Sequence, residues 1–162
     1  MIAVVDTPSV PRAATPRGIR NVLLGFDGSP GAWVALGRAI EIAAGQHARL
    51  VIAGVVKSPS FWISVGAPMT PVTRETLIAD LEREMQRTLA AARDEIPATV
   101  SVTTHLLHGR PAVALAELAD TVGSELIVVG HRQLGPVRRR FTRSVTRGLL
   151  ARTDASVLAV NG

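Results

Sequence analysis

Runs of consecutive apolar residues constrain the fold of this chain more than any other feature of its sequence. Three of them have the length of a strand: Asn21–Phe26, Arg49–Val56 and Leu126–Val129. A strand that is apolar throughout, rather than alternating between apolar and polar residues, is typical of a parallel sheet covered by helices on both faces. The chain is therefore expected to alternate strands with helices.

The segments between those runs carry apolar residues at helical spacing. The first helix is expected to have Ser29 as its N-cap and Pro30 at its first position, and to end at Gly45. The further predicted elements are a loop over 57–71, a long helix from about Val72, a strand near the sheet edge over Thr99–His105, a helix from Pro111 to Gly123, a short helix over Ser144–Ala151 and a last strand over Ser156–Val160. The predicted fold class is α/β, with an open, mainly parallel five-stranded sheet and helices on both faces.

Residues 1–19 contain three prolines and no sustained periodicity, so they are expected to form a flexible N-terminal arm before a single domain over 20–162. The chain has no cysteine, which excludes a disulfide framework and a metal held by thiolates. It begins without the basic start of a signal peptide, and no apolar run approaches the roughly 18 residues of a membrane span. A cytoplasmic protein without membrane contact is expected.

The net charge of +5 raises the question of a nucleic-acid partner. Of the 18 basic residues only Lys57 is a lysine, and arginines gather between Arg132 and Arg152. No groove-reading motif accompanies this basic patch, and aromatic residues make up 3% of the chain, too few for a base-stacking platform. Nucleic acid is therefore not expected as a partner. His105 and His108 have neither cysteine nor a carboxylate nearby in sequence, so a metal site is not expected either.

Ligands of open parallel sheets bind beyond the carboxyl ends of the strands, where the strand order reverses. The strand tips of this chain are Asp27, Val55–Val56 and Gly130, so these three segments are expected to converge on one crevice. Gly130 is followed by a basic loop and then by a helix expected to open at Ser144, a layout in which α/β proteins hold phosphate. The sequence thus predicts a ligand site at these tips.

Five stretches, by their order and spacing, resemble the universal stress protein family over residues of about 20 to 160. They are Val22–Ser29, Gly109–Pro111, Leu126–Gly130, Ser144–Leu150 and Ser156–Val160. The resemblance implies a Rossmann-like domain, similar to adenine nucleotide alpha hydrolases, that is usually a homodimer paired through its last strand. The family has nucleotide-binding and non-binding branches.

In the binding branch, the resemblance implies an aspartate at the first strand end beside the adenine or ribose, a second-strand end that packs the base, and Gly-x2-Gly-x9-Gly-Ser/Thr around the phosphates. Matched to this sequence, these are Asp27, Val55, and a motif from Gly130 to Ser144. The residues expected to contact ATP or another adenine nucleotide are Phe26, Asp27, Val55, Val129, Gly130, Arg132, Gln133, Arg143, Ser144 and Val145.

Two of the three glycines of that phosphate motif are missing, because Gln133 and Arg143 stand at the second and third glycine positions. Glycine suits such loops since a backbone without Cβ can adopt positive φ and lie against a phosphate. Gln133 and Arg143 can therefore obstruct the phosphate. Arg143 can instead bind it through charge-assisted hydrogen bonds, or the arginines can simply solvate an exposed turn.

Two functions remain open from the sequence. One is a stress-response protein that acts by binding, with an adenine nucleotide such as ATP at the strand tips. The alternative is an interaction module without nucleotide, which works through a homodimer paired over Ser156–Val160 and through protein contacts of the basic loop and of Phe61 and Trp62. Asp27 fits either, since its carboxylate can accept a hydrogen bond from a ligand or from its own turn. Enzymatic turnover is not expected, and slow ATP hydrolysis ranks last because no motif supplies a nucleophile, a base or a metal cage.

Overall fold

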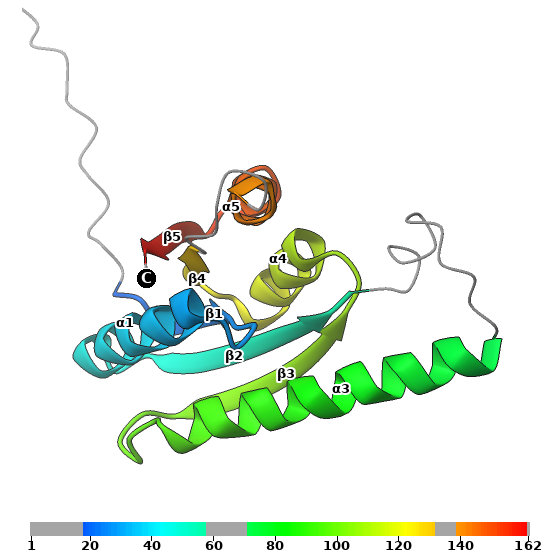
Figure 1. Cartoon of the computed structure of the whole chain (residues 1–162). Helices are drawn as coiled ribbons and strands as arrows, with labels where there is room; N and C mark the ends of the chain where they lie inside the picture. The colour runs from blue at the N-terminus through cyan, green and yellow to red at the C-terminus, as the bar shows by residue number, and fades with distance from the viewer. Residues whose placement is uncertain (1–17, 58–70, 132–138, 162) are drawn as a thin grey trace, which may run out of the picture.

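The computed structural model describes residues 18–57, 71–131 and 139–161 of the chain. Nearly all of the predicted arm over 1–19, and the loop residues Phe61 and Trp62, lie outside the described residues. Strands and helices alternate (Figure 1) in the order β1 (Asn21–Gly25), α1 (Pro30–Gln46), β2 (Arg49–Val56), α3 (Pro71–Asp94), β3 (Val102–His108), α4 (Pro111–Val122), β4 (Leu126–His131), α5 (Arg139–Leu150) and β5 (Ser156–Asn161).

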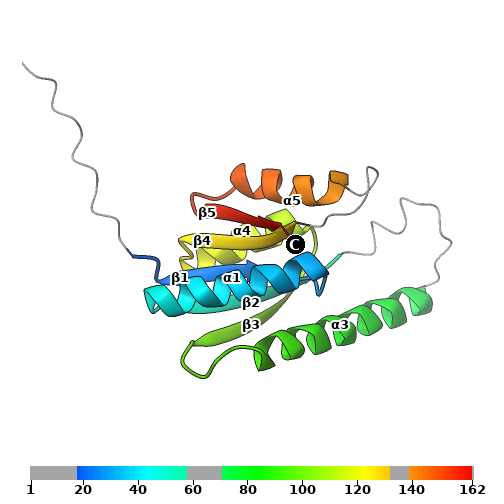
Figure 2. The ribbon, with the colours of Figure 1, turned by 60° about the vertical axis from the view of Figure 1, so that its left-hand side comes forward.

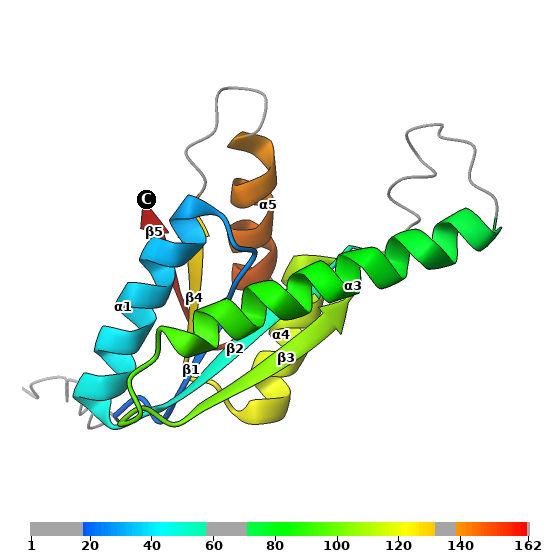
Figure 3. The ribbon, with the colours of Figure 1, turned by 60° about the horizontal axis from the view of Figure 1, so that its bottom comes forward.

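Helices cover both faces of the sheet, with α1 and α3 on one side and α4 and α5 on the other (Figures 1 and 3). Consecutive residues of β1 enter different cores, since Val22 and Leu24 pack on the α1 side whereas Leu23 packs on the α4 side. All three side chains are fully buried, which explains why the strand is apolar at successive positions. The predicted α/β architecture is confirmed.

The strands lie in the order β3-β2-β1-β4-β5, which Figure 2 shows from one edge of the sheet to the other. β1 pairs in parallel with both of its neighbours, so that Leu24 lies between Ile52 of β2 and Val128 of β4. The chain proceeds outward from β1 to the edge strand β3 and then returns to the other side of β1. The strand order therefore reverses between β1 and β4, and the carboxyl ends of these strands flank the place where such folds bind ligands.

The C-terminus of α1 differs from the prediction. Gly45 does not end the helix, which continues to Gln46, and His47 takes the left-handed conformation with φ 53°. The Ala48 N–H donates to the Ala43 carbonyl at 2.9 Å, a hydrogen bond that closes the helix end. Ala48, the residue after this left-handed turn, is buried in the core, and such an apolar contact commonly accompanies a helix end of this kind.

The third strand is also displaced from its predicted position. β3 spans Val102–His108 rather than Thr99–His105, because these residues pair in register with β2 from Leu50 to Val56. The preceding residues form a turn instead, in which the Val100 N–H donates to the Pro97 carbonyl at 2.9 Å. The β-branched run over 99–105 therefore predicted a strand correctly but not its register, which depends on the partner strand.

Glu125 connects the amino ends of β1 and β4, opposite the carboxyl ends that the fold uses for ligands. Its Oε2 accepts from the backbone N–H groups of Asn21 at 2.9 Å and Arg20 at 3.2 Å, and its Oε1 accepts from the Arg20 guanidinium at 3.3 Å. Partial burial by itself raises the pKa of Glu125, but these hydrogen bonds to the charged carboxylate outweigh it, so the pKa lies below its usual value.

We expect Glu125→Gln to lower the free energy of unfolding by about 1 kcal/mol near neutral pH. Because the folded-state pKa is lowered, the carboxylate stabilises the fold above the ordinary glutamate pKa of about 4.3 and loses this effect as the pH falls through the folded value. Urea unfolding of both proteins across the acid range should therefore show their difference shrinking. Glu41→Gln, in an exposed pair with Arg38, is the control. A difference that persists at low pH would contradict this account.

Candidate functional site

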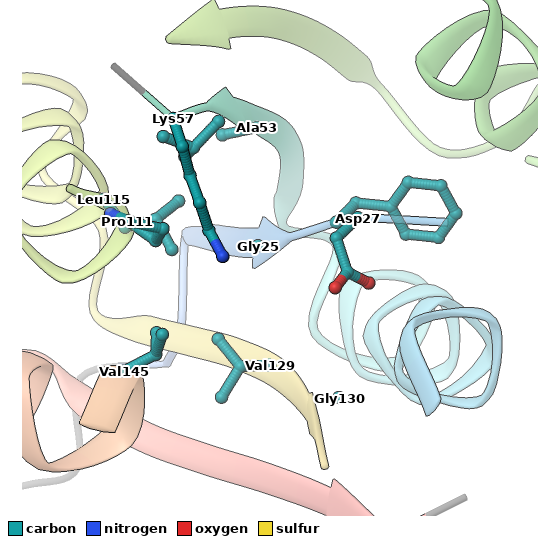
Figure 4. Close-up of a pocket in the computed structure, with 11 residues that line it drawn as sticks. Gly25, Asp27, Ala53, Lys57, Pro111, Leu115, Val129, Gly130 and Val145 are labelled. Carbon is teal, nitrogen blue, oxygen red and sulfur yellow. The ribbon is translucent and has the colours of Figure 1, made fainter. Parts of the chain in front are cut away.

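A pocket lies at the carboxyl ends of β1, β2 and β4, beside the point where the strand order reverses. Its volume is about 150 Å³. We call it the strand-tip pocket, and its lining (Figure 4) consists of Gly25, Phe26, Asp27, Ala53, Val55, Lys57, Pro111, Leu115, Val129, Gly130 and Val145. Residues from β1, β2, β4, α4 and α5, far apart in sequence, therefore meet at one place.

Six of the ten residues singled out from the sequence line this pocket: Phe26, Asp27, Val55, Val129, Gly130 and Val145. Arg132 and Gln133 lie outside the described residues. Arg143 and Ser144 belong to the first half of α5, with their side chains outside the described part of the structure. The six residues thus come together in one pocket. The side chains of the other four, all expected near the phosphates, lie outside the described part of the structure.

The Asp27 carboxylate is fixed by the turn between β1 and α1. Its Oδ1 accepts from the Ser29 N–H at 3.0 Å, and the Ser29 hydroxyl in turn accepts from the Ala32 N–H at 3.2 Å as the N-cap of α1. Gly28, between them, has φ 72°. Figure 4 shows Asp27 at the pocket edge with its carboxylate directed toward the β4 side. The residue therefore stabilises the helix start and also brings a carboxylate to the pocket.

Gly130, the first glycine of the expected phosphate motif, is held against the first turn of α1. A Cβ at this position would lie 2.5 Å from the Ala32 nitrogen and would also collide with the backbone of Gly31. Neither partner can give way, since both are backbone atoms of a buried helix start. Packing between β4 and α1 therefore requires a glycine here, whether or not a phosphate is bound.

The remaining predicted residues form the apolar walls. Val55 and Val145, half-buried, come from β2 and α5, and Val129 is buried in β4. The Phe26 side chain packs in the core on the α1 side, where its ring meets that of Trp33 edge to face at 5.0 Å. Its backbone N–H donates to the Ala53 carbonyl at 2.9 Å, so Phe26 closes the end of β1 onto β2.

The start of α5 does not match the sequence prediction. The helix begins at Arg139 rather than at Ser144, which is therefore its sixth residue. Only the first four N–H groups of a helix lack an intrahelical acceptor, so the Ser144 N–H lies beyond the free donors of the helix start. Arginine favours helix, and this preference extends α5 toward the basic loop. The predicted helix start at Ser144 is therefore wrong, whereas the expected phosphate contact of Ser144 stays a prediction.

Sequence reasoning missed several lining residues, of which Lys57 and Gly25 matter most. Lys57 directly follows β2, and Figure 4 shows its side chain extending across the pocket with the amino group directed into it. It lies two positions after Val55 on an extended strand, the spacing that places two side chains on one face, so the sequence held the necessary signal. Gly25 permits the close approach of Leu115 to β1, since a Cβ there would lie 2.9 Å from Leu115 Cδ1.

The described residues contain neither a cluster of metal ligands nor a membrane-crossing helix. Within residues 18–57, 71–131 and 139–161, no three His, Cys, Asp or Glu side chains are grouped so that they could hold a metal ion. His108 Nε2 instead lies 2.7 Å from Glu82 Oε1, an exposed contact between β3 and α3. None of the described helices has the length and apolar character needed to cross a membrane.

Comparison with known proteins identifies the family. The family model described as "Universal stress protein family" matches residues 18–161, nearly the whole chain. The chain belongs to the universal stress protein family. Among universal stress proteins, one from Thermus aquaticus is 32% identical over 142 residues, which cover 87% of this chain and 98% of that protein. The resemblance inferred from the sequence is confirmed.

Solved structures of universal stress proteins share the fold. One from Burkholderia pseudomallei is 28% identical, with a TM-score of 0.69, over 88% of this chain and 96% of that one. Another, described as a universal stress protein in complex with cAMP, is also 28% identical, with a TM-score of 0.58, over 90% of this chain and 98% of that one. This chain therefore shares its overall fold with these two universal stress proteins.

We expect Gly130→Ala to lower the free energy of unfolding by about 2 kcal/mol, because the added Cβ meets backbone atoms of α1. Gly37→Ala is the matched control, since a Cβ at this exposed position of α1 meets no atom within 4 Å. That change should raise the stability by up to about 1 kcal/mol. Urea unfolding measures both. A Gly130→Ala protein as stable as the wild type would show that the glycine is not needed for packing.

Proposed function

We propose that this universal stress protein binds an adenine nucleotide in the strand-tip pocket and acts through binding rather than turnover. The observation that carries the proposal is the meeting of Asp27, Val55 and Gly130, from three different strand ends, around one pocket at the reversal of strand order. The relative solved in complex with cAMP, at 28% identity, adds support from within the family.

The size and walls of the pocket favour the base as the group held there. A volume of about 150 Å³ is smaller than the roughly 300 to 1,000 Å³ of pockets that enclose drug-sized ligands, so the described residues surround only a ring-sized part of a nucleotide. Val55, Leu115 and Val129 provide apolar surface for a flat ring. Asp27, at the edge, supplies an acceptor for a ribose hydroxyl or an amino group.

A second function is favoured by a specific observation. Gly130 is required for packing against α1, and Asp27 accepts a hydrogen bond within its own turn, so both retained motif residues have roles in the fold alone. A family member that has lost nucleotide binding would keep them for these reasons. Such a protein would act through its homodimer and through contacts with other proteins.

Pairing of two copies through β5 is part of both proposals. Within the described residues β5 pairs only with β4, at the edge of the sheet. Leu158 on this strand is 37% exposed, so an apolar side chain lies at the same edge. A second copy of the same strand would cover both the open backbone edge and this side chain.

Nucleotide binding is tested in two steps. The purified protein is denatured, and any nucleotide that it releases is identified by mass spectrometry. AMP and ATP are then titrated calorimetrically into refolded, nucleotide-free protein. The wild type should bind, and no phosphate should accumulate from ATP. We expect Asp27→Asn to weaken AMP binding about tenfold, since an amide oxygen is a weaker acceptor than a carboxylate for a ribose hydroxyl or an amino group, and this loss outweighs the relief of repulsion with the phosphate beyond the base. The asparagine oxygen can still accept from the Ser29 N–H, so the unfolding temperature should stay close to that of the wild type.

Asp80→Asn, an exposed carboxylate of α3 paired with Arg83, is the matched control and should leave AMP binding unchanged. Unaltered AMP affinity in Asp27→Asn would assign Asp27 to its turn alone. No binding heat in the wild type at millimolar AMP or ATP, with nothing released on denaturation, would reject the nucleotide proposal in favour of the interaction module.

We expect Leu158→Arg to halve the mass measured by size-exclusion chromatography with light scattering, because a charge at the β5 edge would have to be desolvated on pairing. Leu150→Arg is the control, since Leu150 is an exposed leucine at the end of α5 rather than on the strand edge. Its mass should remain that of the dimer. A Leu158→Arg protein that stays dimeric would exclude β5 as the interface.

A further inference from the structure

The charges at the strand-tip pocket come from two side chains of opposite sign. Among the described lining residues only Asp27 and Lys57 are ionisable, and the others are glycine, alanine, proline, valine, leucine and phenylalanine. Lys57 enters from the end of β2 and Asp27 from the turn after β1. The pocket thus pairs one cationic and one anionic group with otherwise apolar walls.

Lys57 is also exceptional within this sequence. It is the only lysine among 18 basic residues, all the others being arginine. An ammonium group on a flexible stem is a compact point charge that can approach an anion from several directions, whereas a guanidinium is larger and planar. Lysine binds phosphate as such a point charge. Figure 4 shows the Lys57 amino group directed into the pocket rather than away from it.

The positive charge of Lys57 affects which ligands the pocket can favour. A pocket with Asp27 as its only ionised group would repel an anionic ligand and would favour neutral adenosine over its phosphates. Apolar walls strengthen the field of a charge compared with open water. Lys57 compensates the carboxylate at the same pocket, and its flexible side chain can turn toward a phosphate that lies beyond the base.

We propose that Lys57 makes the strand-tip pocket selective for anionic adenine nucleotides over the neutral nucleoside. This inference rests on the proposed function, since it assigns the ligand class of the same pocket. Lys57 contributes cationic charge at the β2 side of the pocket. It provides a phosphate contact in a chain in which Gln133 and Arg143 replace two of the motif's glycines.

The test compares the affinities of adenosine, AMP and ATP for the wild type and for Lys57→Met, which keeps an unbranched apolar stem but removes the charge. We expect Lys57→Met to weaken AMP and ATP binding about tenfold while adenosine binding stays within about twofold of the wild type. Lys57→Arg should restore most of the AMP affinity. Because Lys57 is exposed, none of these changes is expected to affect folding.

Arg38→Met is the matched control for net charge, because Arg38 is exposed on α1, pairs with Glu41 and does not line the pocket. It should leave all three affinities unchanged. An equal loss of adenosine and AMP affinity in Lys57→Met, or no loss of either, would overturn the assignment of Lys57 while leaving nucleotide binding intact. A wild type that binds none of the three ligands would overturn the proposed function and this inference together.

A second readout uses the single lysine as a probe. Reductive methylation with ¹³C-formaldehyde gives one lysine resonance, from Lys57, together with that of the terminal amine. AMP at saturation should shift the Lys57 resonance, and adenosine at saturation should shift it much less. Equal shifts with both ligands would show that the amine responds to the base rather than to the phosphate, which would contradict the proposed selectivity.

Discussion

The contact between Gly130 and the backbone of Gly31 and Ala32 is the constraint on which the pocket depends. It brings the carboxyl end of β4 against the first turn of α1, so that the helix start, the Asp27 turn and the end of β4 share a small space. A side chain at this position would separate them, because only backbone atoms stand opposite. The contact lies at the end of the parallel ladder between β1 and β4, where the strand order reverses. Fold and site therefore share one packing requirement.

This shared requirement changes what the family motif means in this chain. Asp27 and Gly130 match the motif, but each also serves the connection between β1, α1 and β4. Because the fold alone explains their presence, Asp27 and Gly130 are by themselves weak support for a bound ligand. Lys57 is exposed at the end of β2, and its side chain belongs to neither buried core. Its role at the pocket is therefore a question for binding measurements rather than for packing.

Much of the fold could be predicted because burial on both faces leaves a direct trace in the sequence. Leu23 and Leu24 are apolar neighbours that enter opposite cores, and this pattern by itself predicts a covered parallel sheet. The boundaries were less accessible. The register of β3 depends on its pairing with β2, which lies far away in sequence. The end of α1 has its left-handed residue at His47, a residue type that does not mark such a turn as glycine does. The family motif placed the start of α5 at Ser144, whereas the arginines before Ser144 favour helix and α5 begins at Arg139.

The candidate site was predictable where a family motif or a strand end marked it, as for Asp27, Val55 and Gly130. Lys57 was missed since a single lysine after a strand has no motif, although its spacing from Val55 places both on one face. Gly25 was missed because its function is to leave space, and a close approach between β1 and Leu115 is visible only in three dimensions.

The most direct test of the account is an amide ¹H–¹⁵N correlation spectrum of the protein recorded as AMP is added. If AMP binds in the strand-tip pocket, the shifts should be concentrated at the carboxyl ends of the strands, at Asp27, Val55, Lys57 and Gly130, and the amino-end residues Asn21 and Glu125 should be unchanged. No shifts at millimolar AMP, or shifts concentrated at the amino ends, would contradict a nucleotide site in the strand-tip pocket.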